Sequence, residues 1–269
     1  MIVFPNIKVN LGLNINEKRA DGYHNLQTVF FPVPWTDILE AVRSDNQGLN
    51  FHSSGIPIPG DNNKNLVIRA FELLSKRHTL PGLTMHLHKN LPMGAGLGGG
   101  SSDGAFALKL INTVCALQLD EETLANYAAE LGSDCPFFIY NRPMFATGRG
   151  ELLEPLSLNL ESWYMLIVMP PLTVGTAEAY SWITPAHPAV SIKEILKESP
   201  DTWKDRLIND FEAPVIQRYP LIGEIKQQLY HQGAAYASMS GSGAAVFGLF
   251  RQQPSTSPWK QYVHWSGQL

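Results

Sequence analysis

Hydrophobic and polar residues alternate near the start of the chain, as they do in a strand that buries one face. The apolar members of the first alternating segment are Ile7, Val9, Leu11, Leu13 and Ile15. Because successive side chains of a strand point to opposite faces, this period of two predicts a half-buried strand over residues 7–15. Segments 27–34, 37–42 and 83–88 carry further strand-like patterns, and Asp21-Gly22 predicts a turn after the first strand.

Helical periods and short apolar runs fill the rest of the chain. Helices are predicted over residues 65–77, 101–117 and 121–131, and Asp120 is the expected N-cap of the third. A buried strand is predicted over residues 163–169. Further helical stretches are expected at residues 176–182, 204–218 and 221–231, and short strands at 236–239 and 244–250.

The order of these elements indicates the fold class. Strands and helices do not alternate strictly as βαβ units, which favours an α+β protein with two lobes. A chain of 269 residues also lies where single hydrophobic cores tend to split. The polar segment 154–161 is the expected boundary, so we expect an N-terminal domain over residues 1–155 and a C-terminal domain over residues 156–269.

Composition and charge narrow the functional classes. Charged residues make up 16% of the chain, below the usual share of about 25%, which argues against a disordered chain. The net charge is −4 and there is no basic run, which argues against a nucleic-acid partner. No apolar run approaches the roughly 18 residues of a membrane helix, and the first ten residues lack the features of a signal peptide. We therefore expect a cytoplasmic protein that acts on a small molecule, without a membrane partner.

The strongest chemical signal is the glycine loop, residues 92–102, which reads Pro-Met-Gly-Ala-Gly-Leu-Gly-Gly-Gly-Ser-Ser and directly precedes a predicted helix. Glycine lets a backbone approach a ligand closely, and a helix N-terminus presents unpaired N–H donors to an anion. We therefore predict that the loop binds the phosphates of ATP, and that the hydroxyl of Ser101 or Ser102 contacts a bound Mg²⁺. The residues assigned to ATP here are Pro92, Gly94, Gly96, Leu97, Gly98, Gly99, Gly100, Ser101 and Ser102.

Other glycine motifs fit this loop less well. Gly94-x-Gly96-x-x-Gly99 matches a dinucleotide-binding fingerprint, but Pro92 separates it from the preceding strand, and the acid about twenty residues on, Asp120, is a helix cap. The Walker loop needs a Lys-Ser/Thr pair after its last glycine, and the protein-kinase motifs are missing. The alternative to a ligand-binding loop is a flexible glycine linker, although this loop joins a predicted strand to a predicted helix.

Several polar residues outside the loop allow two interpretations each. Asp134 precedes an apolar Cys-Pro-Phe-Phe stretch and is either a buried catalytic carboxylate or the cap of a short helix. Lys8 is either its partner or a solvated strand residue, and Tyr23-His24 is either a binding pair or packing at the end of a turn. His86 and His88 share one strand face, but a third zinc ligand is not evident. The segment 240–243, Ser-Gly-Ser-Gly, lacks the spacing of a hydrolase elbow and predicts a tight backbone turn.

Three motifs in order, Asn6 to Leu11, the glycine loop and residues 240–244, resemble those of the GHMP kinases. The resemblance implies a two-lobed GHMP kinase fold with an N-terminal ATP-binding lobe and a C-terminal α/β lobe. It places the active site in the cleft between the lobes and implies ATP and Mg²⁺ as cofactors. It also implies that Asn65 lies near the adenine, and Lys89 joins the set of residues assigned to ATP.

Residues 19–28 and 131–138 are similar to one branch of that family, which phosphorylates the 2-hydroxyl of a cytidine diphosphate-linked methylerythritol in non-mevalonate isoprenoid synthesis. The resemblance implies that Lys8 and Asp134 meet at the acceptor hydroxyl, with Asn10 beside them. It implies that Tyr23 stacks on the cytosine and that His24 hydrogen-bonds its edge. The remaining residues assigned to this substrate are Thr176, Tyr180 and Gly241. The alternatives are another GHMP kinase, of the homoserine or mevalonate type, and a catalytically silent nucleotide-binding regulator.

Overall fold

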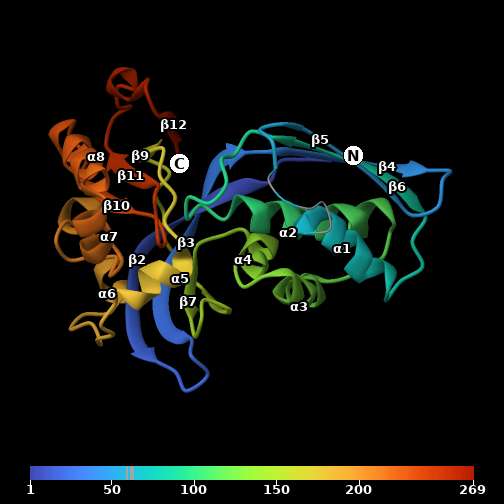
Figure 1. The fold of residues 1–269 in the computed structure, drawn as a ribbon, viewed down its shortest axis with the longest axis horizontal. Coiled ribbons are helices and arrows are strands. Elements are labelled where there is room, and N and C mark those ends of the chain that lie inside the picture. Colours follow the sequence, from blue (N-terminus) through green and yellow to red (C-terminus); the bar gives the residue numbers. More distant parts are fainter. Residues whose placement is uncertain (59, 61–63) are drawn as a thin grey trace. The chain divides into compact units, whose positions relative to one another are not determined.

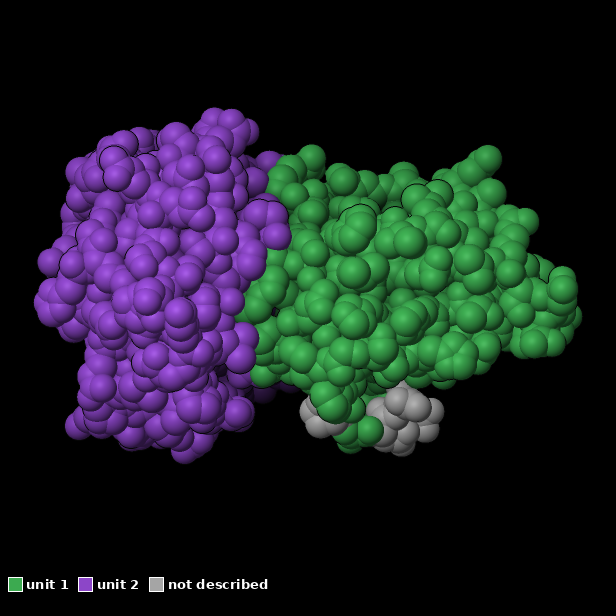
Figure 2. Space-filling view, turned by 90° about the horizontal axis from the view of Figure 1, so that it is seen from above, with its two compact units in different colours: residues 1–7, 35–93, 98–142 green, residues 8–34, 94–97, 143–269 purple. Residues whose placement is uncertain are grey.

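A computed structural model describes residues 1–58, 60 and 64–269, which form two compact units (Figure 2). Unit 1 comprises residues 1–7, 35–93 and 98–142. Unit 2 comprises residues 8–34, 94–97 and 143–269. This division differs from the single boundary expected after residue 155. The reason is that the strand segment around residue 30 pairs with a strand near residue 145, so an early stretch of chain belongs with the later one.

Unit 1 contains a four-stranded sheet in the order β1-β4-β6-β5, with helices on one face (Figure 1). Its strands are β1 (Ile2–Val3), β4 (Ile38–Ser44), β5 (Leu49–Gly55) and β6 (Gly82–Lys89), and its helices are α1 (Leu66–Ser75), α2 (Gly99–Val114), α3 (Glu121–Leu131) and α4 (Cys135–Tyr140). Strand β5, which runs parallel to β6, was not predicted. Its sequence, Leu-Asn-Phe-His-Ser-Ser-Gly, is polar because it forms an exposed edge.

Side-chain caps set the beginnings of two of these helices, α1 and α3, as the sequence predicted for α3. The Asp120 carboxylate accepts a hydrogen bond of 2.8 Å from the Thr123 N–H. The Asn65 side chain caps α1 in the same way, with its carbonyl oxygen 2.9 Å from the Val67 nitrogen. Helix α2 ends at Val114, three residues before the predicted end, because Ala116 takes a left-handed conformation with φ of 55°.

Unit 2 contains two four-stranded sheets in the orders β2-β3-β7-β8 and β10-β11-β9-β12 (Figure 1). The strands are β2 (Asn6–Lys18), β3 (His24–Thr36), β7 (Met144–Thr147), β8 (Leu152–Pro155), β9 (Tyr164–Met169), β10 (Tyr236–Met239), β11 (Val246–Phe250) and β12 (Val263–Gln268). The helices are α5 (Thr176–Ser181), α6 (Ile192–Ile195), α7 (Glu212–Arg218) and α8 (Pro220–His231), with short turns η2 (Pro200–Thr202) and η3 (Ser257–Trp259). None of the helices in the described part of the chain has the length and apolar character that a membrane span requires.

The predicted helix over residues 204–218 is wrong in its first half. Within residues 204–218 only α7 is an α-helix, because residues 208–210 run beside β2 as extended chain. The Leu13 N–H donates to the Ile208 carbonyl at 2.9 Å, and the Asp210 N–H donates to the Leu13 carbonyl at 2.8 Å. Pairing with a distant strand therefore overrides a local helical pattern, and it carries Asn209 and Asp210 to the edge of β2.

Candidate active site

Three consecutive residues of the glycine loop are bound to other segments of unit 2. The Gly96 carbonyl accepts a hydrogen bond of 3.0 Å from the Ser240 hydroxyl, and the Ala95 carbonyl accepts one of 3.3 Å from the Ala245 N–H. The Leu97 carbonyl accepts a 3.0 Å bond from the Lys8 N–H on β2. The three motifs that carry the family resemblance therefore meet within this unit.

The loop requires glycine for both conformation and space. Gly94, Gly96 and Gly98 have φ of 75°, 76° and 73°, in the left-handed region that other residues avoid. At Gly96 an added Cβ would lie 2.2 Å from the Ser240 carbonyl oxygen, which is backbone and cannot turn aside. Gly98 is the N-cap of α2, so the helix begins at Gly99, two residues earlier than predicted, and its first N–H groups follow the loop directly.

A buried group of charges lies beneath the loop in unit 1. The Lys89 side chain is 1% exposed, and its ammonium is paired with the carboxylates of Asp37 and Asp103, the latter at 2.7 Å. Asp37 also accepts the N–H groups of Asn90 and Leu91, at 2.6 and 2.8 Å. Burial of an ammonium is tolerated because these carboxyl groups pair with it. The predicted contact of Lys89 with ATP stays a prediction.

Two buried oxygens in the first turn of α2 have no hydrogen-bond partner among the residues that the structure describes. They are Ser102 Oγ and Asp103 Oδ1. Burial raises the pKa of Asp103 to about 8, although the Lys89 ammonium acts in the opposite direction. Ser101 is half-buried, whereas Ser102 is fully buried. Of the two serines, Ser102 is the one with a buried oxygen that lacks a partner within the described residues, and a bound cation could satisfy it.

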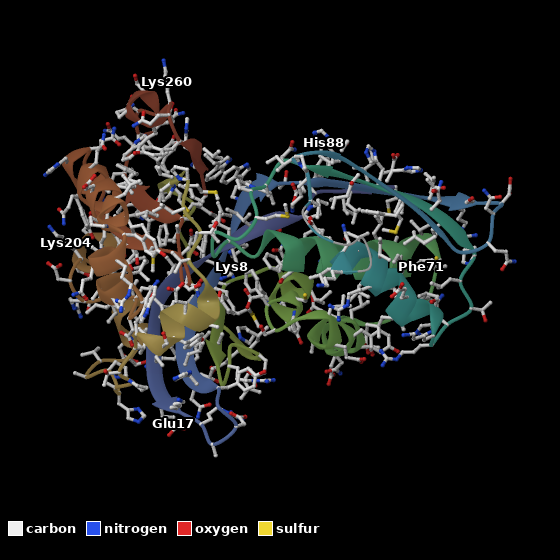
Figure 3. All side chains as sticks on the ribbon, viewed as in Figure 1. Lys8, Glu17, Phe71, His88, Lys204 and Lys260 are labelled. Carbon is white, nitrogen blue, oxygen red and sulfur yellow. The ribbon has the colours of Figure 1, made fainter. Side chains whose placement is uncertain are left out.

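Lys8 and Asn10 form a buried polar pair on β2 (Figure 3 labels Lys8). Lys8 is 4% exposed, so the interpretation as a solvated strand residue is wrong. Its ammonium donates to Asn10 Oδ1 at 2.6 Å and lies 4.8 Å from the centre of the Phe30 ring. Asn10 in turn donates to Thr28 Oγ1 at 3.0 Å, and its backbone N–H donates to Ser240 Oγ at 3.3 Å. These bonds fix the orientation of both side chains.

Asp134 is half-buried in unit 1, immediately before α4. Its side chain makes no capping hydrogen bond to that helix, so the interpretation as a structural cap is wrong. The next residue, Cys135, is fully buried, and burial raises the pKa of its thiol to about 12, which keeps it protonated.

The residues predicted to read a base gather in unit 2. Tyr23 is 56% exposed, so it is not packing at the end of a turn, and the Arg149 guanidinium lies 4.9 Å from its ring centre. The His24 ring stacks on Tyr180 with centroids 4.8 Å apart and planes 17° apart. Burial, aided by Lys18, lowers the pKa of His24. At neutral pH the imidazole is therefore uncharged, with one donor and one acceptor nitrogen.

The remaining predicted residues take supporting positions. Thr176 Oγ1 lies 3.2 Å from Ser242 Oγ, which joins α5 to the turn at residues 240–243, called here the Ser240 turn. Gly241 lies in that turn with φ of 57°, and its carbonyl accepts a 2.8 Å bond from Asn209 Nδ2. Asn65 uses its side-chain oxygen to cap α1.

Sequence reasoning missed four residues of this arrangement: Asp37, Asp103, Arg149 and Asn209. Asp103 could have been found from the sequence. It lies one turn into a helix among residues that are buried, and a charged residue at such a position is unusual. The other three act through contacts with residues more than thirty positions away along the sequence, which no local pattern reveals.

His86 and His88 both contact Ser54 Oγ at 2.9 Å. No group of three or more His, Cys, Asp or Glu suited to a metal occurs among residues 1–58, 60 and 64–269.

Comparison with known proteins agrees with this geometry. A family model for the GHMP kinases N terminal domain matches residues 65–142, and one for GHMP kinases C terminal matches residues 186–256. The chain is 49% identical to a 4-diphosphocytidyl-2-C-methyl-D-erythritol kinase of Parabacteroides distasonis over 272 residues, covering 100% of both chains. It is 52% identical to the corresponding kinase of Bacteroides thetaiotaomicron over 255 residues, covering 94% of this chain and 93% of the relative.

Solved structures show the same fold. A crystal structure of 4-(cytidine 5'-diphospho)-2C-methyl-D-erythritol kinase matches with a TM-score of 0.85 and 31% identity, covering 99% of this chain and 98% of that one. A homoserine kinase from Cytophaga hutchinsonii matches with a TM-score of 0.68 at 19% identity, covering 98% and 94%, and shows the fold alone. The chain therefore belongs to the GHMP kinases, enzymes that use ATP, and within them to the family of 4-diphosphocytidyl-2-C-methyl-D-erythritol kinases.

We predict that Gly96→Ala destabilises the protein, because the left-handed backbone alone costs about 1–2 kcal/mol for a residue with a Cβ and the contact with the Ser240 carbonyl adds to it. Gly100→Ala is the matched control, since an added Cβ meets nothing within 4 Å there. Urea unfolding measures both, and the free energy of unfolding should fall only in the first. Equal behaviour of the two variants would show that the Gly96 contact does not hold the loop.

Proposed function

We propose that this protein transfers the γ-phosphoryl group of ATP to the 2-hydroxyl of 4-diphosphocytidyl-2-C-methyl-D-erythritol, a step of non-mevalonate isoprenoid precursor synthesis. The observation that carries the proposal is the attachment of loop residues 95–97 to Lys8 and to the Ser240 turn within unit 2. It joins a phosphate-binding backbone to a buried lysine. The relatives over the whole chain length, which are named as kinases of this substrate, support the choice of acceptor.

Phosphoryl transfer requires neutralised charge, alignment of the reacting oxygens and a route for the proton. The backbone N–H groups of the glycine loop and the positive end of the 16-residue helix α2 are suited to hold the phosphates. Lys8 is proposed to contact the transferring phosphoryl group. Its bond to Asn10 keeps the ammonium fixed, which limits the entropy lost on binding.

Mg²⁺ fits the loop through Ser102. The buried hydroxyl oxygen of this serine, which is unsatisfied among the described residues, is a hard oxygen ligand of the kind that Mg²⁺ prefers. When bound with ATP, the ion would supply neutralising charge to the phosphates.

Asp134 is proposed to orient the acceptor hydroxyl and to receive its proton. The residue is half-buried and does not spend its carboxylate on capping α4. Because the transition state of phosphoryl transfer is loose, positioning of the hydroxyl contributes more than early deprotonation does. In this step the bond between the γ-phosphorus and the oxygen of the β-phosphate breaks as the bond to the acceptor oxygen forms, the hydroxyl proton passes to the Asp134 carboxylate, and ADP is released.

The cytidine part of the substrate is assigned to Tyr23, His24, Thr176 and Tyr180. Tyr23 offers an exposed ring for stacking, and its Arg149 contact leaves the opposite face of the ring for a base. The neutral His24 imidazole, held flat against Tyr180, can donate one hydrogen bond and accept another. That combination matches the mixed donor and acceptor edge of cytosine.

The test of the proposed function is an ADP-release assay with equal concentrations of the cytidine substrate, homoserine, mevalonate and galactose. We expect turnover with the cytidine substrate to exceed that with each of the other three alcohols by about a hundredfold or more, because the base-binding residues have no partner in the smaller acceptors. Faster phosphorylation of homoserine, mevalonate or galactose would overturn the proposal.

We predict that Asp134→Ala lowers kcat by about 10²–10⁴-fold, because the acceptor hydroxyl loses its orienting and proton-accepting group. The affinity for ATP, measured by calorimetry without the acceptor, should stay within about twofold of wild type. Asp120→Ala serves as a control, since it removes a helix cap carboxylate in the same unit without touching the proposed chemistry. Near-normal kcat in a folded Asp134→Ala protein would remove this residue from the mechanism.

We predict that His24→Ala erodes the preference for the cytidine substrate over its uridine counterpart, because the site then lacks the group that reads the base edge. In wild type, KM for the cytidine substrate should be constant above neutral pH and rise once the pH falls below the lowered pKa of His24, since protonation removes the acceptor nitrogen. His24→Ala should abolish this rise.

Two variants of Tyr23 test the stacking contact in the same kinetic assay. Stacking on a base is worth about 1–3 kcal/mol, so Tyr23→Ala should raise KM for the cytidine substrate about tenfold to a hundredfold, whereas Tyr23→Phe should be mild. KM for ATP is the internal reference in every variant. Retention of the full cytidine preference and of the acid-side rise in KM by His24→Ala would show that the base is read elsewhere.

A further inference from the structure

A pocket of about 710 Å³ lies within unit 2, on the far side of Asn209 from the residues assigned to the substrates. It is lined by the loop that follows α5, by residues 206–210 and by α7. None of the residues assigned above to ATP or to the acceptor lines it. The volume falls within the range of roughly 300–1,000 Å³ that is usual for small-molecule sites.

The walls of this pocket are largely apolar. Its large hydrophobic side chains are Trp182, Ile183, Val190, Ile195, Ile208 and Ile216. The Arg218 guanidinium lies 3.9 Å from the centre of the Trp182 ring, a contact that fixes one wall. Because burial of apolar surface is favourable at roughly 25 cal/mol per Å², a ligand with an apolar body would gain affinity here.

One charge in the pocket stands without an opposite charge. The Asp210 carboxylate accepts the Ile15 N–H at 2.7 Å and the Asn14 side-chain amide at 3.2 Å, both of which are neutral donors. No ion pair of Asp210 occurs within the described ranges 1–58, 60 and 64–269. Burial raises the pKa of this carboxyl, which is the expected effect of desolvation without a nearby cation.

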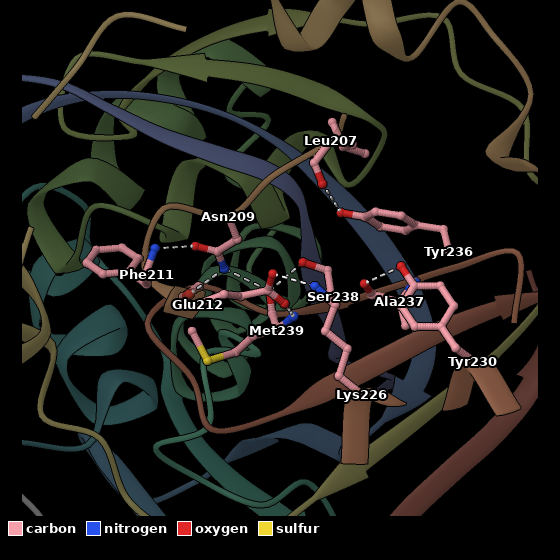
Figure 4. A network of polar contacts seen from close by, with 11 residues as sticks. Leu207, Asn209, Phe211, Glu212, Lys226, Tyr230, Tyr236, Ala237, Ser238 and Met239 are labelled. Carbon is pink, nitrogen blue, oxygen red and sulfur yellow. Dashed lines mark hydrogen bonds and ion pairs between the residues drawn. The ribbon is translucent and has the colours of Figure 1, made fainter. Parts of the chain in front are cut away.

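The other ionisable residues that line the pocket are already paired or lie in solvent. Arg206 is bonded to Glu198 at 2.8 Å, and Glu212 is bonded to Lys226 at 2.7 Å. Glu212 also accepts the Met239 N–H at 2.7 Å, as Figure 4 shows. His187 is exposed. The electrostatic potential near Asp210 is therefore negative, which disfavours an anionic ligand such as a phosphate.

We propose that this pocket binds an organic cation with an apolar body, such as an arylalkyl primary amine, whose ammonium pairs with the Asp210 carboxylate while the body packs on Trp182 and the isoleucines. A charge-assisted hydrogen bond is about twice as strong as a neutral one, and the ammonium would also relieve the cost of burying an uncompensated carboxylate. This site lies beyond the proposed kinase function and does not depend on it.

The pocket adjoins the segment that supports the Ser240 turn. Asn209, the neighbour of Asp210, donates both of its side-chain hydrogens, to the Met239 and Gly241 carbonyls at 2.8 Å each (Figure 4). Asp210 itself is bonded to β2 next to Asn14 and Ile15. A ligand at Asp210 would therefore rest against the supports of the turn without occupying the nucleotide or acceptor positions, and it should bind together with ATP.

Calorimetry on the full chain tests the proposal with two probes of nearly equal shape, 2-phenylethylamine and 2-phenylethanol. We expect the amine to bind with an affinity about tenfold or more above that of the alcohol, because only the amine can pair with the carboxylate. In Asp210→Asn, which keeps an acceptor oxygen for the Ile15 N–H, the two probes should bind equally weakly.

A steric pair of variants separates this pocket from other sites. Ala213 lines the pocket, so Ala213→Phe should fill it and abolish amine binding while leaving Asp210 intact. Gln217→Phe places the same ring on an exposed position of α7 outside the lining and should bind the amine as wild type does. Thermal unfolding followed by circular dichroism confirms that each variant is folded.

Four results would overturn the proposal. The first is the absence of saturable amine binding to wild type at up to about 10 mM, a concentration that begins to fill even a weak site. The second is equal affinity for the amine and the alcohol, and the third is unchanged amine binding in Ala213→Phe. The fourth is displacement of the amine by ADP together with CDP. The last result would place the amine in the nucleotide or acceptor site. A kinase that binds the amine as expected but fails to phosphorylate the cytidine substrate would contradict the proposed function alone.

Discussion

The rest of the site depends on the attachment of a glycine backbone to a distant turn. Ser240 donates its hydroxyl to the Gly96 carbonyl, and the chain at Gly96 runs so close to Ser240 that no Cβ fits. Lys8 is bonded to the next residue of the loop, so the strand that carries the lysine and the loop share one frame. Such preorganisation matters in phosphoryl transfer, where catalysis consists largely of positioning and charge stabilisation.

Buried charge is the second organising principle of this protein. Lys8 and Lys89 are both almost completely buried, and each is held by specific oxygens, an amide in the first case and two carboxylates in the second. A buried ammonium is tolerated only with such partners. The printed partners of the two lysines differ in kind, because Lys8 donates to the neutral amide of Asn10 and Lys89 is paired with Asp37 and Asp103.

The fold and the substrate are determined by different parts of the chain. Homoserine and mevalonate kinases share the fold at low sequence identity, so the fold does not select the acceptor. We propose that selection depends on a few side chains around Tyr23 and His24, which are exposed or half-buried and contribute little to the hydrophobic core. The ligand proposed for the pocket beside Asp210 rests on a similar division, with apolar walls for the body and one carboxylate for the charge.

The sequence by itself determined what depends on neighbouring residues: the presence of the strand around residues 7–15, the helix of residues 121–131 from its cap at Asp120, and a glycine loop directly ahead of a helix. The strand is buried on both faces and not on one, as its period of two predicted, because other segments cover its polar side. Only the tertiary structure decided what depends on distant ones. Residues 208–210 are extended because they pair with β2, and Ser102 has the unsatisfied oxygen of the two serines because its hydroxyl is fully buried. Lys89 is buried as an ion pair because two acidic residues, 52 and 14 residues away, enclose it. Periodicity and capping act over one or two turns of chain, whereas burial and ion pairing are settled by the segments that folding brings together.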